Sequence, residues 1–197
     1  VSIDKKFGRK KVLHEVSIEV GRSEVVGLLG RDGAGKTVTF YSILGLLPIN
    51  AGHIFLDGED ITGLSLDRRA RRGLGYLPQE ASIFRGLTVE QNILTVLELF
   101  EPNTVSRARK LDELLAEFHI EYVRNVPARA LSGGERRRCE IARAMAANPT
   151  IMLFDEPFAG IDPMSVRDIK AMIAQLENHE VGILITDQNV REMVDLL

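Results

Sequence analysis

The sequence has little cysteine, no long apolar run and no excess of positive charge. Its single cysteine, Cys139, excludes an intrachain disulfide bond and favours a reducing compartment. The longest apolar stretches, near residues 25–29 and 183–185, are far shorter than the roughly 18 residues that a membrane span requires. The basic start of the chain contains no apolar segment, so a secretory signal is not expected. Acidic residues outnumber basic residues by 28 to 25, which argues against nucleic acid as the main partner.

The residues that are present suit one globular domain. The chain has 197 residues, of which 45% are hydrophobic and 27% are charged, as in folded proteins. This length can bury a substantial core, so we expect a single domain over residues 1–197.

Alternating strand and helix patterns predict an α/β fold. Apolar residues at even positions over residues 12–20 predict a half-buried strand. The continuous apolar run at residues 25–29 predicts a strand covered on both faces. A glycine-rich turn follows, and then a predicted helix over residues 36–47 that Pro48 ends. Further strands are predicted over residues 53–57, 75–77, 150–154 and 181–186.

The middle of the chain reads as a helical subdomain inserted into the α/β core. Thr88 and Gln91 have the spacing of a capping box at the start of a helix. A second amphipathic helix is predicted over residues 106–118. Its apolar face comprises Leu111, Leu114, Leu115 and Phe118.

Two further helix starts are predicted after the later strands. Asp162 is the expected N-cap of one helix, with Pro163 at its first position. Asn189 and Glu192 have the spacing of a capping box for a helix that runs off the end of the sequence.

The strongest chemical signal is GRDGAGKT at residues 30–37, which fits the P-loop pattern GxxxxGK[ST] between an apolar strand and a helix. In such a loop, glycines let backbone N–H groups at a helix N-terminus approach phosphate oxygens closely. Lys36 is predicted to reach the β- and γ-phosphates, and the Thr37 hydroxyl to ligate Mg²⁺. The predicted nucleotide contacts are Gly30, Arg31, Asp32, Gly33, Ala34, Gly35, Lys36, Thr37 and Val38.

A second candidate phosphate-binding element is LSGGE at residues 131–135. Ser132 and Glu135 have capping-box spacing, while Gly133 and Gly134 leave backbone N–H groups bare at the start of a helix. Taken alone, the same pattern equally suits an ordinary helix start.

A pair of adjacent carboxylates ends the predicted strand in IMLFDEP, residues 151–157. Asp155 can hold Mg²⁺ through water, and Glu156 is placed to orient or deprotonate an attacking water molecule. The alternative is that both are only turn and cap residues, and the P-loop in the same chain argues against it.

In this order, the motifs GRDGAGKT, YLPQ, LSGGE, LFDEP and GIDP resemble the ATP-binding cassette (ABC) ATPases over essentially the whole chain. The resemblance implies ATP and Mg²⁺ as cofactors, and that Phe7 stacks on adenine while Gln79 reaches Mg²⁺. It also implies a head-to-tail homodimer. Each ATP would lie between the P-loop of one cassette and residues 132–134 of the other, with Asp162 lining the interface.

The resemblance implies an architecture as well. The expected fold is that of a P-loop NTPase, with a mixed or parallel sheet, an antiparallel N-terminal β part and an inserted helical subdomain. The RecA-like core is expected at about residues 1–79 and 146–197, and the helical subdomain at about 80–145. Because the family pattern continues past the helix near Asn189, the chain is expected to lack a C-terminal tail and its first residues.

The stretches between the motifs, such as GYLPQEASIFRGLTV and LITDQNVRE, resemble the ATPase subunits of lipopolysaccharide exporters. Branched-chain amino-acid importer ATPases have a similar core, and EASIFR favours the exporter. The resemblance implies a subunit on the cytoplasmic face of the inner membrane, with permease subunits docking near Gln79, Phe84 and Arg85.

A soluble cassette ATPase of DNA repair or translation is the alternative class. Such proteins carry long coiled-coil insertions or tandem cassettes, unlike this sequence.

The sequence departs from the family pattern at three places. Arg31 and Asp32 replace Pro-Asn, Val38 replaces a second threonine, and Gln188 replaces the histidine that contacts the γ-phosphate. Glutamine keeps an amide donor but cannot carry charge or shuttle a proton. Because losing one transition-state donor costs about 10²- to 10³-fold in rate, we expect slower hydrolysis than in a histidine-bearing relative. A nucleotide-binding subunit without turnover is the alternative.

Two arginine-rich runs, at residues 67–72 and 136–138, are predicted to be solvated helix faces that pair with nearby acidic residues. Phe84 and Arg85 are predicted to be a core residue and a cap residue. The resemblance to the family implies the alternative, in which this region receives a short helix of the membrane subunits and an exposed Phe84 anchors it.

Overall fold

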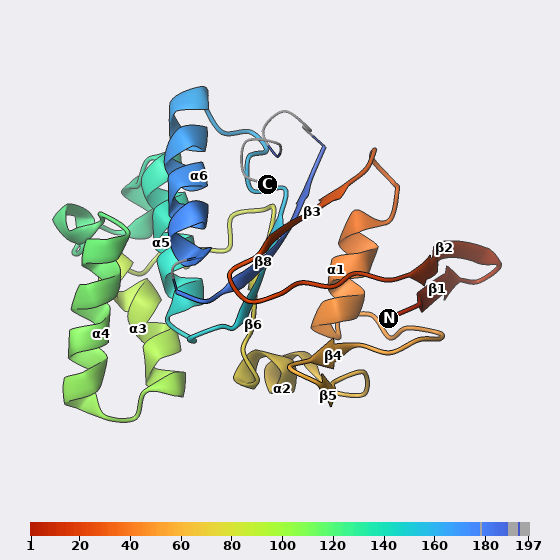
Figure 1. Ribbon diagram of the computed structural model, residues 1–197. Helices are drawn as coiled ribbons and strands as arrows, with labels where there is room; N and C mark the ends of the chain where they lie inside the picture. The colour runs from red at the N-terminus through yellow and green to blue at the C-terminus, as the bar shows by residue number, and fades with distance from the viewer. Residues whose placement is uncertain (178, 189–192, 194–197) are drawn as a thin grey trace.

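A four-stranded parallel sheet forms the centre of the protein in this computed structural model, which describes residues 1–177, 179–188 and 193. The strand order is β3 (Val25–Leu29), β8 (Gly182–Asp187), β7 (Ile151–Asp155) and β6 (Leu74–Leu77). Two antiparallel hairpins flank the sheet (Figure 1). They consist of β1 (Ile3–Phe7) with β2 (Lys10–Val16), and β4 (Phe55–Leu56) with β5 (Glu59–Asp60).

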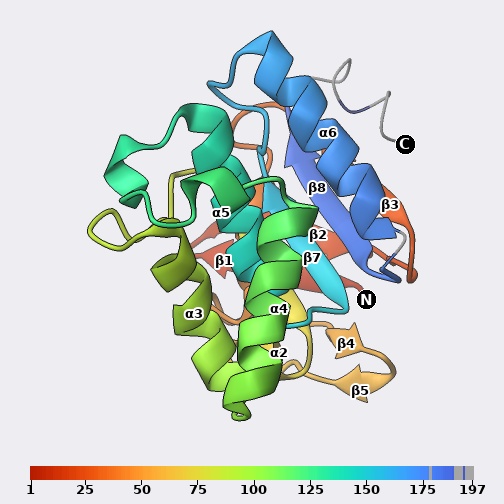
Figure 2. The same cartoon turned by 90° about the vertical axis from the view of Figure 1, so that its left-hand side faces the viewer.

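Helices lie on both sides of this sheet. One side carries α1 (Lys36–Leu44) and α2 (Leu66–Arg71) together with the hairpins. The other side carries α3 (Val89–Phe100), α4 (Thr104–Glu117), α5 (Gly133–Met145) and α6 (Pro163–Glu177), which Figure 2 shows in front of β7 and β8. Two short 3₁₀ helices, Glu121–Val123 and Ala128–Ala130, connect α4 to α5. Within the residues that the structure describes, no helix is long and apolar enough to cross a membrane.

The strands bury side chains on both faces because successive residues of a strand point in opposite directions. Met152 and Phe154 of β7 pack with α3 to α6, whereas Leu153 between them packs with Phe40 and Leu44 of α1. This double burial explains why the strand sequences are continuously apolar. The predicted helical subdomain therefore shares a hydrophobic core with the sheet, and its boundaries near residues 80 and 145 stay a prediction.

The predicted α/β fold with a parallel sheet, antiparallel N-terminal strands and inserted helices is confirmed. Local signals placed several elements correctly. The capping box of Thr88 and Gln91 is present. Asp162 begins α6, where its Oδ1 accepts hydrogen bonds from the backbone N–H groups of Met164 and Ser165 at 3.1 and 3.0 Å. The predicted helix start at Asn189 and Glu192 lies outside the described residues.

Other element boundaries were predicted wrongly. The strand expected over residues 12–20 ends at Val16, because Val16 pairs with Ile3, the first residue of the partner strand β1. The helix α1 ends before Gly45, whose left-handed φ of 79° stops it three residues earlier than expected. The strand expected over residues 53–57 is reduced to Phe55–Leu56. The strand at residues 25–29 is only partly buried because it lies at the edge of the described sheet.

The arginine-rich runs are not uniformly solvated, which corrects that prediction. Arg69 is buried, and its guanidinium donates hydrogen bonds to the carbonyls of Ser42 and Ile43, at the C-terminal end of α1. It also donates to the carbonyls of Leu64 and Thr62. The last carbonyls of a helix lack intrahelical partners, so a buried guanidinium satisfies them. Arg137 is likewise buried, where it donates to the carbonyl of Pro78 and pairs with Glu140.

Candidate nucleotide-binding and catalytic site

The loop between β3 and α1 has the backbone shape that a phosphate cradle requires. Gly33 and Gly35 adopt left-handed φ values of 76° and 100°. At Gly35 the positive φ favours glycine, and a Cβ atom would lie 3.0 Å from Cδ2 of Leu13, so the Leu13 side chain would have to shift.

The first turn of α1 lacks a side-chain cap. Gly35 occupies the N-cap position and makes no side-chain hydrogen bond. The four other long helices each have a capping side chain, from Thr88, Asn103, Ser132 and Asp162. Because the first N–H groups of a helix need acceptors, the uncapped end of α1 suits an anion.

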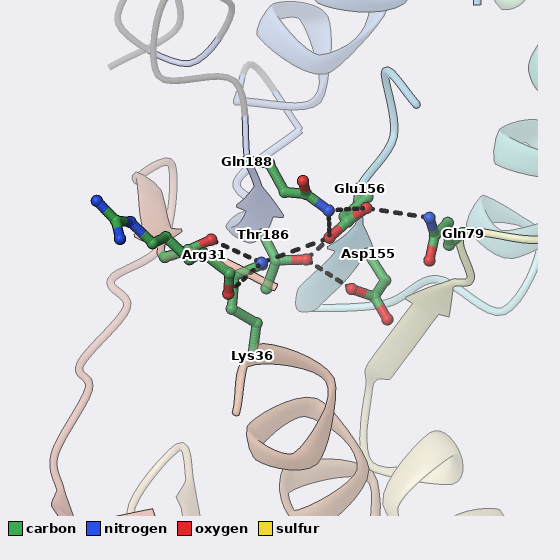
Figure 3. A network of polar contacts seen from close by, with 8 residues as sticks. Arg31, Lys36, Gln79, Asp155, Glu156, Thr186 and Gln188 are labelled. Atoms are coloured by element: carbon green, nitrogen blue, oxygen red, sulfur yellow. Dashed lines mark hydrogen bonds and ion pairs between the residues drawn. The ribbon is translucent and has the colours of Figure 1, made fainter. Parts of the chain in front are cut away.

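Lys36, at the start of α1, is buried and bends back over the loop. Its Nζ donates to the carbonyl of Gly30 at 2.7 Å and approaches the carbonyl of Arg31 at 3.4 Å. The same Nζ lies 3.5 Å from Oε1 of Glu156 (Figure 3). The lysine is therefore held at the predicted phosphate site by weak acceptors that a phosphate could replace.

Glu156, which directly follows β7, is the centre of the polar network in Figure 3. Its Oε2 accepts a hydrogen bond from Nε2 of Gln79 at 3.0 Å. Nε2 of Gln188 lies 3.2 and 3.3 Å from its two carboxylate oxygens. The backbone of Glu156 has a positive φ of 45°, which is uncommon for a residue with a side chain and recurs at functional sites.

Asp155, the last residue of β7, is only 3% exposed. Its Oδ1 accepts a hydrogen bond from Oγ1 of Thr186 at 2.6 Å, and its Oδ2 lies 3.5 Å from the hydroxyl of Tyr76. Burial and the nearby Asp155 carboxylate raise the pKa of Tyr76. In the described part of the chain Asp155 forms no ion pair, and a buried carboxylate without a countercharge favours a bound cation.

The topology brings these residues together. Because β3, β6, β7 and β8 are parallel, their carboxyl ends lie at one edge of the sheet. The P-loop follows β3, Gln79 follows β6, Glu156 follows β7 and Gln188 follows β8. In open parallel sheets this edge is the usual place for a ligand.

The remaining predicted site residues have no side-chain contact with Glu156 among the hydrogen bonds and ion pairs of the described residues. Ser132, Gly133 and Gly134 begin α5, and no hydrogen bond or ion pair among the described residues links them to Lys36 or Glu156. Phe7, Arg31, Asp32, Gly33, Ala34, Thr37 and Asp162 are exposed, while Val38 is partly buried. Nζ of Lys5 lies 5.1 Å from the Phe7 ring centroid.

The start of α5 is held by the predicted capping box. Oγ of Ser132 accepts from the backbone N–H of Glu135, and Oε2 of Glu135 accepts from the backbone N–H of Ser132 at 2.8 Å. Hydrogen bonds from the Ser132 side chain and backbone lower the pKa of Glu135. The capping-box prediction at residues 132–135 is confirmed.

Sequence analysis did not identify two residues of the cluster, Thr186 and Tyr76. Each touches Asp155 from a neighbouring strand. The one available signal was a polar residue in an otherwise apolar strand, as Thr186 is within GILITD.

The oxygen donors present suit Mg²⁺ held partly by a nucleotide. Thr37, Asp155 and Gln79 supply a hydroxyl, a carboxylate and an amide oxygen, which are ligand types that Mg²⁺ accepts. The described residues contain no group of three or more His, Cys, Asp or Glu side chains placed to hold a metal by themselves. Mg²⁺ commonly uses one or two protein oxygens together with phosphates and water, so this sparse set fits.

Comparison with known proteins agrees with this geometry. Residues 13–159 match the protein family described as ABC transporter. The chain is 58% identical over 193 residues to a probable ABC transporter ATP-binding protein of Azorhizobium caulinodans, covering 98% of this chain and 69% of that protein. It is 55% identical over 196 residues to the lipopolysaccharide export system ATP-binding protein LptB of Haemophilus influenzae, covering 99% and 81%.

A solved structure shares the fold. The ADP conformation of MJ1267, an ATP-binding cassette of an ABC transporter, superposes with a TM-score of 0.89 at 25% sequence identity. The superposition covers 100% of this chain and 82% of that one. Cassettes of this kind are ATPases that bind ATP, typically with Mg²⁺, and work as dimers with transmembrane partners. The chain therefore belongs to the ABC transporter family, as one of its ATP-binding subunits.

Proposed function

We propose that this chain hydrolyses ATP to power the extraction of lipopolysaccharide from the inner membrane for export to the outer membrane. The substrate is supported by relatives. The chain is 55% and 53% identical to the LptB proteins of Haemophilus influenzae and Escherichia coli, and covers 81% and 80% of them. These relatives favour the exporter over the branched-chain amino-acid importer.

The observation that carries the ATPase assignment is the convergence of Lys36, Gln79 and Gln188 on the carboxylate of Glu156. Phosphate oxygens would replace the carbonyls of Gly30 and Arg31, and the carboxylate of Glu156, as partners of Lys36. That exchange releases Glu156 to accept a proton from an attacking water molecule.

Bound Mg²⁺ would neutralise charge on the phosphates, and Thr37, Gln79 and Asp155 would hold it. The side chain of Phe7 is exposed and free to stack on adenine from the loop end of β1. Arg31, Asp32 and Val38 leave the glycines, Lys36 and Thr37 in place, so these substitutions are compatible with ATP binding.

A second cassette would complete the site. Residues 132–134 lie at the start of α5, and no hydrogen bond or ion pair among the described residues joins them to Lys36. This supports a second phosphate-binding element that comes from another copy. A head-to-tail homodimer supplies it, with Asp162 in the interface.

The permease subunits would dock near Gln79, Phe84 and Arg85 on the cytoplasmic face of the inner membrane. The Phe84 side chain is 52% exposed, and the guanidinium carbon of Arg143 lies 5.0 Å from its ring centroid. Asn92 holds the backbone of Phe84 through hydrogen bonds of 2.9 and 3.1 Å. An exposed aromatic on a fixed backbone is a good anchor for a partner helix.

Replacing Glu156 tests the assignment in the full-length subunit assembled with its membrane partners. Glu156→Gln should lower kcat by about 10²- to 10⁴-fold, because general-base catalysis contributes about that much, while ATP still binds. Glu113→Gln, an exposed change on α4, is the matched control. Unchanged hydrolysis in Glu156→Gln would exclude the ATPase site. Hydrolysis by the parent without ATP-dependent release of lipopolysaccharide from vesicles would exclude the transport substrate.

Gln188 supports a narrower proposal, that hydrolysis is slowed. Its amide reaches both oxygens of Glu156 but cannot shuttle a proton. Gln188→His should raise kcat, on the order of tenfold, because part of a transition-state donor worth about 10²- to 10³-fold is already supplied by the amide. Equal kcat values for the parent and Gln188→His would refute slowed hydrolysis. No hydrolysis in the parent, with activity in Gln188→His, would identify a subunit that binds without turnover.

A further inference from the structure

Asp155 is oriented by hydroxyl groups from the strands on both sides of it. On β8, Thr186 is the register partner of Asp155 and is fully buried. Its hydroxyl donates to Oδ1 of Asp155 at 2.6 Å. On β6, the hydroxyl of Tyr76 lies 3.5 Å from Oδ2.

Thr186 also reaches the next residue of the site. Its Oγ1 accepts from the backbone N–H of Glu156 at 3.2 Å, and its carbonyl accepts from the same N–H at 2.9 Å. One buried hydroxyl therefore links the Asp155 carboxylate to the backbone of Glu156, which is in the left-handed region.

Tyr76 is held in place by packing. Its ring meets the ring of Phe40 on α1 edge to face, with centroids 6.5 Å apart and an interplanar angle of 78°. Its hydroxyl is therefore directed to the Asp155 end of the strand by the same helix that follows the P-loop.

A hydroxyl partner and a cationic partner have different effects on the charge of a carboxylate such as Asp155. A lysine or arginine partner would neutralise Asp155, whereas a hydroxyl orients the carboxylate and leaves its charge and remaining lone pairs for a metal or its bound water. Figure 3 shows Thr186 between Asp155 and Glu156, with Lys36 directed to Glu156.

We propose that Thr186 and, more weakly, Tyr76 are positioning residues that hold the buried Asp155 carboxylate ready for Mg²⁺, and that Thr186 keeps Glu156 in register with it. This inference rests on the proposed ATPase function. Outer partners of metal-binding groups commonly contribute 10- to 100-fold to metal affinity, roughly the size of effect expected for Thr186.

The test is the affinity of Mn²⁺ for the ATP-bound full-length subunit, measured by electron paramagnetic resonance. Thr186→Val keeps the side-chain shape and removes the hydroxyl, so Mn²⁺ binding should weaken about 10- to 100-fold. Thr186→Ser should restore affinity close to that of the parent. Tyr76→Phe should weaken binding only about two- to fivefold, because its contact is long. ATP affinity without metal should not change in any variant.

Thr150→Val is the matched control, because Thr150 has a hydroxyl 3.4 Å from the carbonyl of Gly73, next to the opposite end of β7. It should leave Mn²⁺ affinity unchanged.

Parent-like Mn²⁺ affinity in Thr186→Val overturns the inference, as does a loss in Thr186→Ser equal to that in Thr186→Val. If Thr186→Val does not fold, parent-like affinity in Tyr76→Phe overturns it. A parent that does not hydrolyse ATP, yet shows the Mn²⁺ shifts, contradicts the proposed function and supports this inference.

Discussion

Buried polar side chains in this protein act as connectors between distant segments. Arg69 satisfies the carbonyls at the C-terminal end of α1 across 26 to 27 residues of sequence. Thr186 reaches Asp155 across 31 residues, and Tyr76 reaches it across 79. A buried donor with several acceptors is costly to remove because the acceptors then lack partners.

Replacing Arg69 should therefore destabilise the fold more than replacing its exposed neighbour. We expect Arg69→Met to lower the free energy of unfolding by about 2–4 kcal/mol, since several buried carbonyls lose their donor. Arg71→Met, in the same short helix, should change it by less than about 0.5 kcal/mol. Urea unfolding followed by circular dichroism measures both, and equal effects would contradict the role given to Arg69.

The candidates for catalysis stand out in the sequence because their chemistry restricts both residue type and spacing, and their catalytic roles stay a prediction. A lysine after a glycine-rich loop and two carboxylates after a strand stand close in the sequence to the elements that position them. Thr186 and Tyr76 carry no such local pattern, and their importance depends on which strands lie beside β7.

Helix starts were the most predictable feature at the scale of elements. The capping boxes at Thr88 and Ser132 and the cap at Asp162 all involve residues two or three positions apart. Strand ends were less predictable, because β2 ends where its partner strand β1 begins, and no pattern within residues 12–20 shows where that is.

The cap of α3 offers a direct test of this local contribution. Thr88→Ala removes the acceptor for the backbone N–H of Gln91, so the free energy of unfolding should fall by about 1 kcal/mol. Leu99→Ala, at an exposed position of the same helix, is the control and should change it by less than about 0.5 kcal/mol. Thermal unfolding of both variants measures the two changes in the free energy of unfolding. A Thr88→Ala protein as stable as the parent would show that the cap contributes nothing.

Strand order places the candidate site of the whole molecule, because it gathers four loops at one edge of the sheet. No hydrogen bond or ion pair among the described residues joins the start of α5 to Lys36 or Glu156. In the proposed assembly, other chains supply the second phosphate-binding element and the contact with the membrane. The exposed positions at Gly133 and Phe84 allow two contacts to be tested without disturbing the core.

Dimerisation should be sensitive to bulk at Gly133. A Cβ atom there meets nothing within 4 Å, so Gly133→Arg should fold normally. In the proposed homodimer the arginine would fill the space for the partner's nucleotide, so ATP-dependent dimerisation of a Glu156→Gln subunit should be lost in size-exclusion chromatography. Gly63→Arg, at another open glycine, is the control. Dimerisation that survives Gly133→Arg would contradict the proposed arrangement.

Membrane docking should depend on Phe84. Phe84→Ala should reduce co-purification of the permease subunits at least tenfold, since a buried aromatic anchor often contributes about 2 kcal/mol or more at an interface. ATP binding by the isolated subunit should not change. Leu99→Ala serves as the control because Leu99 is exposed on α3. Normal co-purification with Phe84→Ala would place the docking surface elsewhere.

The sequence by itself determined the α/β class, the P-loop, the two carboxylates after β7 and the helix caps, because each depends on residues close together along the chain. Only the tertiary structure decided that Lys36, Gln79 and Gln188 converge on Glu156, that Arg69 is buried, and that Thr186 and Tyr76 orient Asp155. The physical reason is that these contacts join segments far apart in sequence, through parallel strand neighbours at the site and through packing of α2 against the end of α1 at Arg69. Local patterns report mainly on residues close together along the chain.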